Sequence, residues 1–367
     1  MLSKNKAVEV RTIHETKEFE RLEDQWNHLL AQNHTQSAFL TWEWLFSWWQ
    51  VYEQGHKLWL VTAWREEELV GIIPLMLSNK QKYSLSFRML RPLGSPHCDV
   101  SGIILKNNNE EVLALLSDFL VKQEQYWDIL EFNRYAQDDP ALKFIKGYFD
   151  KAGYKSRVKI YDHFYIPLKG KWDDYLANLS KKFREILRRS ARRAAKIGEV
   201  SFQYFSGEEA SWEIFQKIIE INRYSKYPII YQSEKEQNFH KKLFTRMPGK
   251  GLLNIFLLEV DNIPVAYQYG FVQNKRYEPW RVAYDFRFPP RVSVGTLLYK
   301  LATEKAFELG YTEIDFLRGD EAYKLNWKPE KRKYVKIRFI RRNNFLALFI
   351  FIWLPQVKKL FSRVKRR

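Results

Sequence analysis

The sequence predicts an α/β protein made of two tandem copies of one fold, each a mixed, mostly antiparallel sheet flanked by helices. Three observations support this fold class. The 367 residues exceed what a single hydrophobic core usually holds. Hydrophobic residues make up 46% of the chain, which is enough for large cores. A hairpin, a helix and a short buried strand follow one another twice, so we expect one domain at 1–160 and a second at 161–340.

The first copy is predicted from period-two alternation in strands and from three- and four-residue apolar steps in helices. Strands at 58–64 and 69–77 are joined by the charged turn 65–68, which predicts a hairpin. The helix at 42–52 is aromatic all round, which is typical of a core helix. The other predicted elements are strands at 8–13 and 127–132 and helices at 18–30, 110–122 and 140–152.

The second copy repeats this plan. Strands at 253–260 and 263–272 flank a turn at 261–262. A helix starts near Val294, and Gly310 is placed to end it. The following strand, 311–317, is similar in sequence to 126–132 of the first copy. We therefore expect the same topology in both copies.

The two copies differ just before this helix. The second copy carries Ser293, Val294, Gly295 and Thr296, where a glycine lets a ligand approach the backbone and first-turn amides can bind a phosphate. The first copy has no glycine there and places Glu110 and Glu111 in its first turn. Only the second copy is expected to hold an anionic cofactor. The competing interpretation of the turn is ordinary helix-start chemistry.

Ionisable side chains gather after the last strand of the second copy, at Asp315, Arg318, Asp320 and Lys324. Functional residues of open α/β sheets tend to lie at such strand ends. A carboxylate inside an apolar strand, as at Asp315, needs a partner. Lys324 or Arg318 could be that partner, which would make the cluster structural.

These residues also carry a resemblance. The Ser-x-Gly-Thr-Leu-Leu turn, the run 315–320 and the Tyr323-Lys324 pair before Trp327 resemble the CelD-like branch of the GNAT acyltransferase superfamily, which is related to the FemAB-like peptidyltransferases. The resemblance extends from about Phe39 to Trp327 and leaves out the C-terminal tail. The turn here carries fewer glycines than the family's usual loop.

The resemblance implies a tandem GNAT acyltransferase that uses acetyl-CoA or another acyl-CoA as co-substrate, with no metal. Ser293, Val294, Gly295 and Thr296 would cradle the pyrophosphate, supported by Arg291. Asp315 and Asp99 are the alternative general bases, and Tyr284 is a further catalytic candidate. A Cys98-based triad beside Asp99 is excluded, because neighbours in an extended strand point to opposite faces. The expected substrate-binding residues are Lys181, Arg184, Arg188, Arg318, Asp320, Tyr323 and Lys324.

The net charge of +18 is unevenly distributed. Residues 181–196 carry a net charge of +7 and residues 328–367 carry +13, so the remaining chain is close to neutral. A basic helix at 180–197 is expected, and its crowded cations favour an anionic partner over a merely solvated face. We expect it to hold the phosphate of a nucleotide- or lipid-linked glycan acceptor, and we expect no DNA partner.

The tail at 341–367 places ten apolar residues, 345–354, between basic clusters. Ten residues are too few to span a bilayer. An apolar run with Phe and Trp between cations is typical of an anchor on an anionic membrane surface. The alternative is a C-terminal helix that docks on the protein's own core.

The single cysteine and the lack of an apolar segment behind the N-terminus favour a cytoplasmic protein without disulfides, working at the inner membrane face. The resemblance implies a role in cell-envelope or exopolysaccharide synthesis. Two alternatives stay open. One is Fem-type aminoacyl transfer from aminoacyl-tRNA to a peptidoglycan precursor. The other is a non-catalytic basic protein that binds membrane or nucleic acid.

Overall fold

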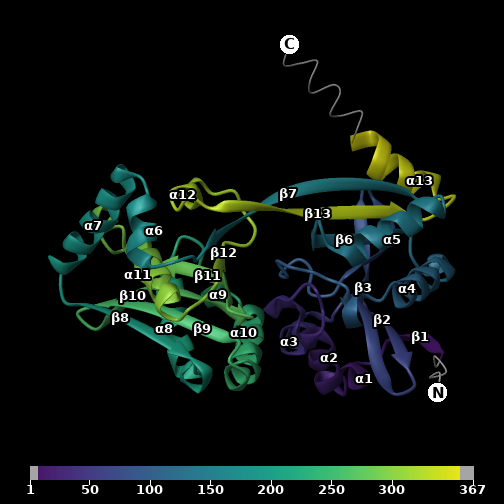
Figure 1. Ribbon diagram of the computed structural model, residues 1–367, viewed down its shortest axis with the longest axis horizontal. Helices are drawn as coiled ribbons and strands as arrows, with labels where there is room; N and C mark the ends of the chain where they lie inside the picture. Colours follow the sequence, from purple (N-terminus) through teal and green to yellow (C-terminus); the bar gives the residue numbers. More distant parts are fainter. Residues whose placement is uncertain (1–6, 356–367) are drawn as a thin grey trace, which may run out of the picture. The chain divides into compact units, whose positions relative to one another are not determined.

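The computed structural model describes residues 7–355, which divide into two compact units (Figure 1). The first unit contains the described residues up to Tyr161 and those from Lys333 onward. The second unit is Asp162–Arg332. Each unit is a mixed, mostly antiparallel sheet flanked by helices, which confirms the predicted fold class.

In the first unit the strand order is β1-β2-β3-β4-β6-β13. The predicted hairpin is β2 with β3, and β4 runs parallel to β6 after the helical crossover α4. The bounds are β1 Val8–Ile13, β2 His56–Arg65, β3 Glu68–Lys82, β4 Leu85–Pro92, β5 Ile104–Leu105, β6 Ile129–Ala136, β13 Glu330–Ile340, α1 Thr16–Glu20, α2 Glu23–Ala31, α3 Trp42–Tyr52, α4 Glu110–Lys122 and α5 Pro140–Lys151.

Helices α4 and α5 pack on one face of this sheet, where Leu116, Ile145, Phe132 and Phe339 are buried together. The aromatic helix α3 is almost wholly buried, as predicted. The predicted helix 18–30 is instead two helices, α1 and α2, because the chain turns between Glu20 and Glu23. Leu22 and Phe19 are both buried at this turn.

In the second unit the strand order is β7-β12-β11-β10-β9-β8. It repeats the first unit: β9, β10 and β11 form an antiparallel meander, and β11 runs parallel to β12 after the crossover helix α11. The bounds are β7 Lys155–Pro167, β8 Val200–Ser206, β9 Leu253–Val260, β10 Ile263–Gln273, β11 Arg276–Tyr284, β12 Glu313–Asp315, α6 Trp172–Asn178, α7 Lys181–Ala195, α8 Trp212–Arg223, α9 Ile229–Gln232, α10 Glu234–Arg246, α11 Val294–Glu308 and α12 Ala322–Leu325.

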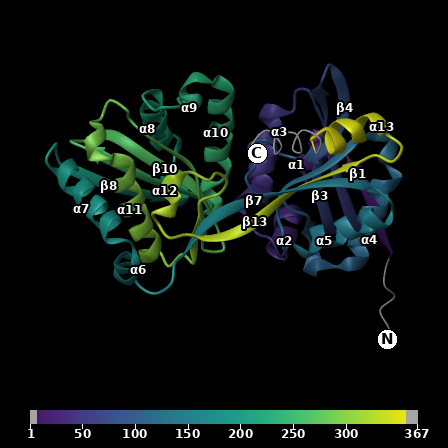
Figure 2. The same cartoon turned by 90° about the horizontal axis from the view of Figure 1, so that it is seen from above.

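Two layers of helices cover the second sheet. Helices α7 and α11 pack on one face through Leu187, Leu298 and Phe256. Helices α8 and α10 lie on the other face, where Phe215 and Tyr269 meet edge to face at 6.2 Å (Figure 2).

Each sheet is completed by a strand from a distant part of the chain. Strand β13 pairs with β6 through the register Tyr334–Ala136 to Ile340–Ile129. The end of β7 pairs with β12 through Glu313–Pro167 to Asp315–Tyr165. The structural boundaries therefore differ from the predicted domain at 161–340, because residues 333–340 belong to the first unit.

The apolar run at 345–354 forms helix α13 (Phe345–Leu348) and a π-helical continuation, Phe349–Trp353. One side of this segment is buried in the first unit: Ala347, Ile350 and Phe351 pack with Phe87 and Met89. The alternative of a C-terminal helix that docks on the protein's own core therefore holds for that side of the segment. Residues 356–367 of the predicted membrane-surface tail lie outside the described part. None of the helices within residues 7–355 has the length and apolar content needed to cross a bilayer.

Candidate functional site

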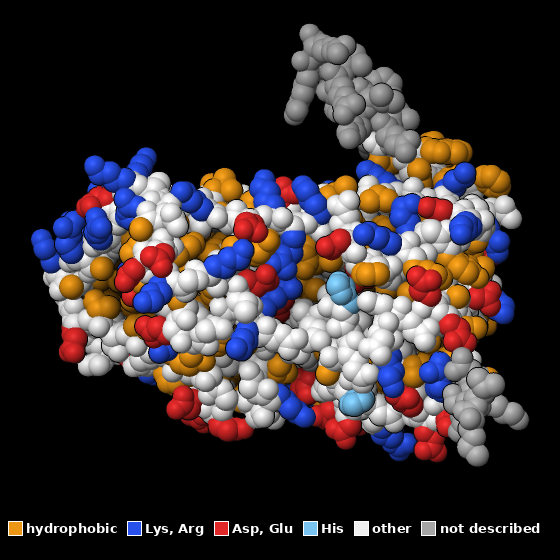
Figure 3. All heavy atoms as spheres, viewed as in Figure 1, with side chains coloured by type: hydrophobic (Ala, Val, Ile, Leu, Met, Phe, Trp, Pro, Cys, Tyr) orange, Lys and Arg blue, Asp and Glu red, His pale blue; other side chains and the backbone are white. Residues whose placement is uncertain are grey.

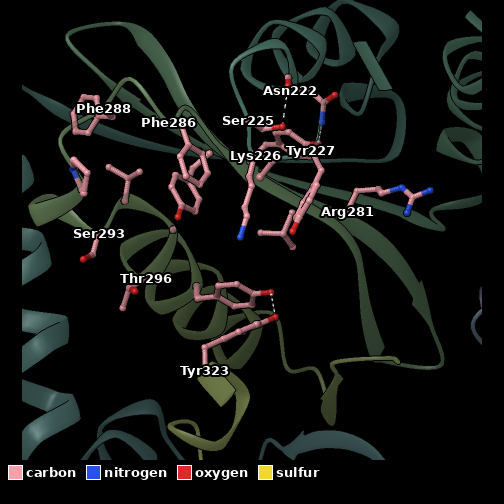
Figure 4. A pocket seen from close by; sticks show the side chains of 18 of the residues that line it. Asn222, Ser225, Lys226, Tyr227, Arg281, Phe286, Phe288, Ser293, Thr296 and Tyr323 are labelled. Carbon is pink, nitrogen blue, oxygen red and sulfur yellow. Dashed lines mark hydrogen bonds between the residues drawn. The ribbon is translucent and has the colours of Figure 1, made fainter. Parts of the chain in front are cut away.

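The second unit contains a pocket of about 670 Å³. Its walls are the end of β11, the turn into α11, one face of α11, the α12 loop and the α8–α9 connection. Tyr227, Tyr284, Phe286 and Phe288 give it a largely aromatic lining (Figure 4). An apolar cavity with few polar groups is the usual form of a small-molecule site.

The pocket exists because two parallel strands separate. Strand β11 pairs with β12 only at Arg276 and Tyr277. The later residues of β11, from Trp280 to Tyr284, line the pocket instead. Backbone groups at such a divergence can hydrogen-bond a bound molecule in place of a neighbouring strand.

The N-terminus of α11 opens into this pocket, since Ser293, Val294, Gly295 and Thr296 all line it. Ser293 is the N-cap residue in the left-handed region, with φ 58° and ψ 50°, and its side chain makes no capping hydrogen bond. The Thr296 amide donates to the Ser293 carbonyl at 2.9 Å, so an anion would be held by the positive end of the helix dipole and by the amides of Val294 and Gly295. The structure places the predicted phosphate turn at the pocket.

A side chain at Gly295 would press against an aromatic ring. A Cβ atom at this position would lie 3.0 Å from Cδ1 and 3.2 Å from Cε1 of Tyr284. The Tyr284 ring in turn stacks on Phe286 with centroids 5.0 Å apart. The space beside Gly295 is therefore occupied by Tyr284, which brings this predicted catalytic candidate directly against the predicted cofactor turn.

Two phenol groups, one from α11 and one from α12, meet at the pocket wall. The hydroxyl oxygens of Tyr299 and Tyr323 lie 2.8 Å apart, and both residues line the pocket (Figure 4). Tyr299 follows Gly295 by one helical turn on α11. Burial raises the pKa of Tyr299 well above its ordinary value, and the neighbouring Tyr323 adds to the shift. Such a phenol stays protonated at neutral pH and can donate a proton.

The pocket wall contains no Asp, Glu or His among the residues that the structure describes. Lys226 points its ammonium group into the space, whereas the guanidinium of Arg281 points away from it (Figure 4). Arg281 approaches Glu236 of α10 at 3.6 Å. The charged lining is therefore cationic, and a negatively charged ligand is favoured.

Neither predicted base lines this pocket. Asp315 is fully buried and lies 2.6 Å from Arg276 Nη2 and 3.8 Å from Arg332 Nη1, while its second oxygen accepts from the Leu317 amide. Burial alone would raise the pKa of Asp315, but the two arginines outweigh it and hold the pKa below its ordinary value. A low pKa and occupied oxygens make Asp315 a structural anion in this state. The arginines, rather than Lys324 or Arg318, are its partners.

Asp99 is buried in the first unit, whereas the α11 turn belongs to the second unit. The side chains of its sequence neighbours, His97 and Cys98, form hydrogen bonds with other groups. His97 Nδ1 accepts a hydrogen bond from Trp48 Nε1 at 2.9 Å, and Cys98 Sγ donates to the Val100 carbonyl. The exclusion of a Cys–His–Asp triad agrees with these contacts.

The predicted substrate-binding cluster divides in two. Tyr323 lines the pocket. Lys324 is buried and donates to the carbonyls of Phe316, Arg318 and Gly319, with an ion pair to Glu321 at 2.8 Å. It therefore holds the loop together and is not accessible to a substrate. Arg318 and Asp320 are exposed, and they are not part of the lining.

The predicted basic helix is α7, capped by Ser180, whose Oγ accepts from the Phe183 amide at 3.2 Å. Phe183 and Leu187 face the core, and Lys181 and Arg188 are exposed. The Arg184 side chain instead donates to the Leu179 carbonyl at 3.0 Å. Figure 3 shows Lys and Arg side chains gathered on this helix.

Helix α7 is tied to the phosphate turn. Arg193 donates from Nη1 to the carbonyl of Arg291 at 2.7 Å, and the helix packs beside both this turn and α11. Arg291 itself is exposed and is not part of the lining. The cations of α7 therefore lie next to the turn that can bind a phosphate.

The sequence analysis missed one wall of the pocket. Asn222, Ser225, Lys226, Tyr227 and Ile230 come from α8, α9 and the segment between them. Helix α8 itself could have been found from the apolar spacing of Phe215, Ile218 and Ile221. No sequence pattern indicates that its end turns toward the pocket.

The family comparison decides the assignment. Residues 181–325 match the model for an acetyltransferase (GNAT) domain, and this segment contains the whole α11 turn and all of the pocket lining except Asn326 and Trp327. This segment is a GNAT-like domain. The second unit is the acetyltransferase-like domain, and the repeated topology of the first unit gives the tandem arrangement.

Solved structures are similar in fold to the whole chain. FemX is similar with a TM-score of 0.62 and 12% identity, over 93% of this chain and 99% of that chain. L-PGS from Bacillus licheniformis gives a TM-score of 0.53 and 11% identity, over 89% and 94%. A conserved Bacteroides thetaiotaomicron protein of unknown function gives 0.53 and 12%, over 90% and 100%. The comparison with curated proteins found no significant match.

Proposed function

We propose that the second unit transfers an acyl group from an acyl-CoA, with acetyl-CoA the simplest donor, to the amine of a cell-envelope or exopolysaccharide acceptor. One observation carries the proposal: the uncapped N-terminus of α11 opens into the aromatic pocket beside the separated strands β11 and β12. The GNAT domain match supports acyl-CoA as the donor class.

In this proposal the first-turn amides of α11 bind the pyrophosphate, and the α7 cations contribute a positive field beside it. The thioester then lies in the pocket within reach of both phenols. The acceptor nitrogen attacks the thioester carbonyl, the carbon–sulfur bond breaks, and an amide forms. Tyr299 donates its proton to the departing thiolate, and the proton that the acceptor nitrogen loses restores the Tyr299 phenol.

The lining favours an amine over a hydroxyl as acceptor. A hydroxyl needs a base to remove its proton, and the described wall has no carboxylate or imidazole. An amine whose neutral form is populated near neutral pH needs none. Positioning of the two substrates would then supply most of the rate enhancement.

Isothermal titration of the intact protein with acetyl-CoA tests the donor. Saturable binding that Gly295→Val removes, with the fold intact by circular dichroism, supports the assignment. Absence of binding by the intact protein would overturn it.

The phenol pair provides a second test. Tyr299→Phe keeps the ring and removes the proton donor, so we expect kcat to fall roughly 10²-fold with KM nearly unchanged. Because the pKa of Tyr299 is raised, wild-type activity should persist into the alkaline range. Ser225→Ala, at a pocket hydroxyl away from α11, is the control. An unchanged kcat in Tyr299→Phe would remove this residue from the mechanism.

A second candidate is aminoacyl transfer from aminoacyl-tRNA. The specific observation in its favour is the structural similarity to FemX over nearly the whole of both chains, together with the cationic surface of α7. Transfer of a radiolabelled aminoacyl group, with no binding of acetyl-CoA, would favour this candidate over the first.

A further inference from the structure

Helix α13 and its π-helical continuation carry a ridge of exposed apolar side chains. Phe345, Leu346, Phe349 and Trp353 have exposed fractions of 71%, 49%, 49% and 48%. Phe345, Phe349 and Trp353 recur at four-residue steps, which places them on one side of the helical segment. Ala347, Ile350 and Phe351 on the other side are buried. The helix therefore has two apolar sides, and residues within 7–355 cover only one of them.

The tip of the β3–β4 hairpin extends this exposed surface. Lys82 donates from Nζ to the Ile350 carbonyl at 3.2 Å and lies 4.5 Å from the Phe351 ring centroid. The next residues at the tip include Tyr83 and Leu85, which are 56% and 37% exposed. Figure 3 shows hydrophobic side chains at the surface over α13, with Lys and Arg beside them.

The segments that form this ridge carry cations and no acidic side chain. The segments 79–86 and 341–354 contain no Asp or Glu, and Lys80, Lys82 and Arg157 lie at the rim, with Arg157 donating to the Phe351 carbonyl. Arg341 and Arg342 are neutralised by Asp128 and Glu124, so they add little. The sequence beyond Pro355 adds six Lys or Arg and no acid.

We propose that this ridge inserts into the surface of an anionic lipid bilayer. Phe and Trp at a helix surface bury their rings at the boundary between headgroups and acyl chains, and nearby lysines attract anionic headgroups. The exposed apolar side, the aromatic content and the lysines at the rim all match this one partner. The inference is independent of the acyl donor and acceptor.

The test uses the intact chain and vesicles of phosphatidylcholine, alone or with roughly one third phosphatidylglycerol. We expect flotation with the anionic vesicles and weak binding to the neutral ones. Binding should fall as salt rises, because lipid charges act on the rim over about one Debye length, roughly 8 Å at physiological salt. Salt-independent binding to both vesicles would overturn the charge assignment.

The decisive variant is the triple change Phe345→Ser, Phe349→Ser and Trp353→Ser. It should weaken partitioning onto anionic vesicles by roughly tenfold or more, because three exposed rings lose their burial. The matched control removes three exposed apolar side chains elsewhere: Leu115→Ser, Ile197→Ser and Ile263→Ser. Equal thermal unfolding of both variants excludes a folding defect.

Two outcomes would overturn the proposal. Equal vesicle binding by wild type and triple variant would show that the ridge does not insert. A wild type that ignores vesicles but dimerises by light scattering, with a monomeric triple variant, would make the ridge an interface between copies. Lys80→Gln reports on the rim alone and should reduce anionic binding only at low salt.

Discussion

At the scale of single residues, Gly295 joins the phosphate turn to the aromatic wall. Gly295→Val should abolish acetyl-CoA binding, because its side chain would strike the Tyr284 ring beside the turn. Titration calorimetry is the measurement. Gly147→Val in α5 is the matched control, since a Cβ there meets nothing within 4 Å.

The double change Gly295→Val with Tyr284→Ala separates two explanations. If the ring is the only obstacle, its removal restores binding. If a ligand must approach the backbone at residue 295, binding stays lost. Restored binding would contradict the close-approach role that the sequence pattern suggests.

Asp315 contributes to stability in a pH-dependent way. Its folded pKa lies below the ordinary value of 3.8, so its stabilisation is fully present above that value and is lost as pH falls through the folded pKa. Asp315→Asn should lower the free energy of unfolding by about 3 kcal/mol near neutral pH, because Arg276 and Arg332 lose their closest buried anion. Denaturant unfolding at pH 7 and at pH 3 measures both effects. A stable variant with lost turnover would instead restore Asp315 as a catalytic base.

At the scale of elements, the loop between β12 and α12 is organised by one buried ammonium. Lys324→Ala leaves the carbonyls of Phe316, Arg318 and Gly319 without their shared donor. We expect a loss of about 3 kcal/mol of stability. Tyr323 should also be displaced, which lowers activity. Lys328→Ala is the control, because it removes an exposed ammonium group that donates to the Asn178 carbonyl. Equal stability of the two variants would contradict the prediction.

The sequence predicts elements well where local periodicity decides them. Both hairpins, α7 and the crossover helices have apolar spacings that favour one secondary structure. The turn at 293–296, Tyr284 and Tyr323 line the pocket, and their predicted roles stay predictions. Two features escaped. The partners of Asp315 are arginines on other strands, and the α8–α9 wall depends on how helices pack on the sheet.

At the scale of the whole molecule, strand β13 decides which truncations the chain tolerates, because it completes the first sheet from a distant part of the sequence. A chain that ends after Arg332 loses β13, so it exposes the edge of β6 and removes Ile337 and Phe339 from the first core. We expect the first unit to become protease-sensitive while the second unit stays protected. Limited proteolysis with mass spectrometry measures this difference.

A chain that ends after Arg342 keeps β13 and is the control for this experiment. It uncovers Phe87 and Met89, so its first unit should melt at a lower temperature but remain folded. Equal protection of the first unit in both truncations would contradict the structural role of β13. Because a truncation also removes core contacts of the first unit, surface substitutions are the cleaner test of the membrane ridge.

The return strand β13 also sets an order of events during synthesis. The second unit is continuous in sequence, whereas the first must keep the edge of β6 open until residues 333–340 leave the ribosome. At elongation rates of about 5 to 20 residues per second, this interval lasts roughly ten to forty seconds. An unpaired strand edge is a template for aggregation for as long as it stays open. The nascent first unit is therefore the part of this protein that most needs chaperone cover.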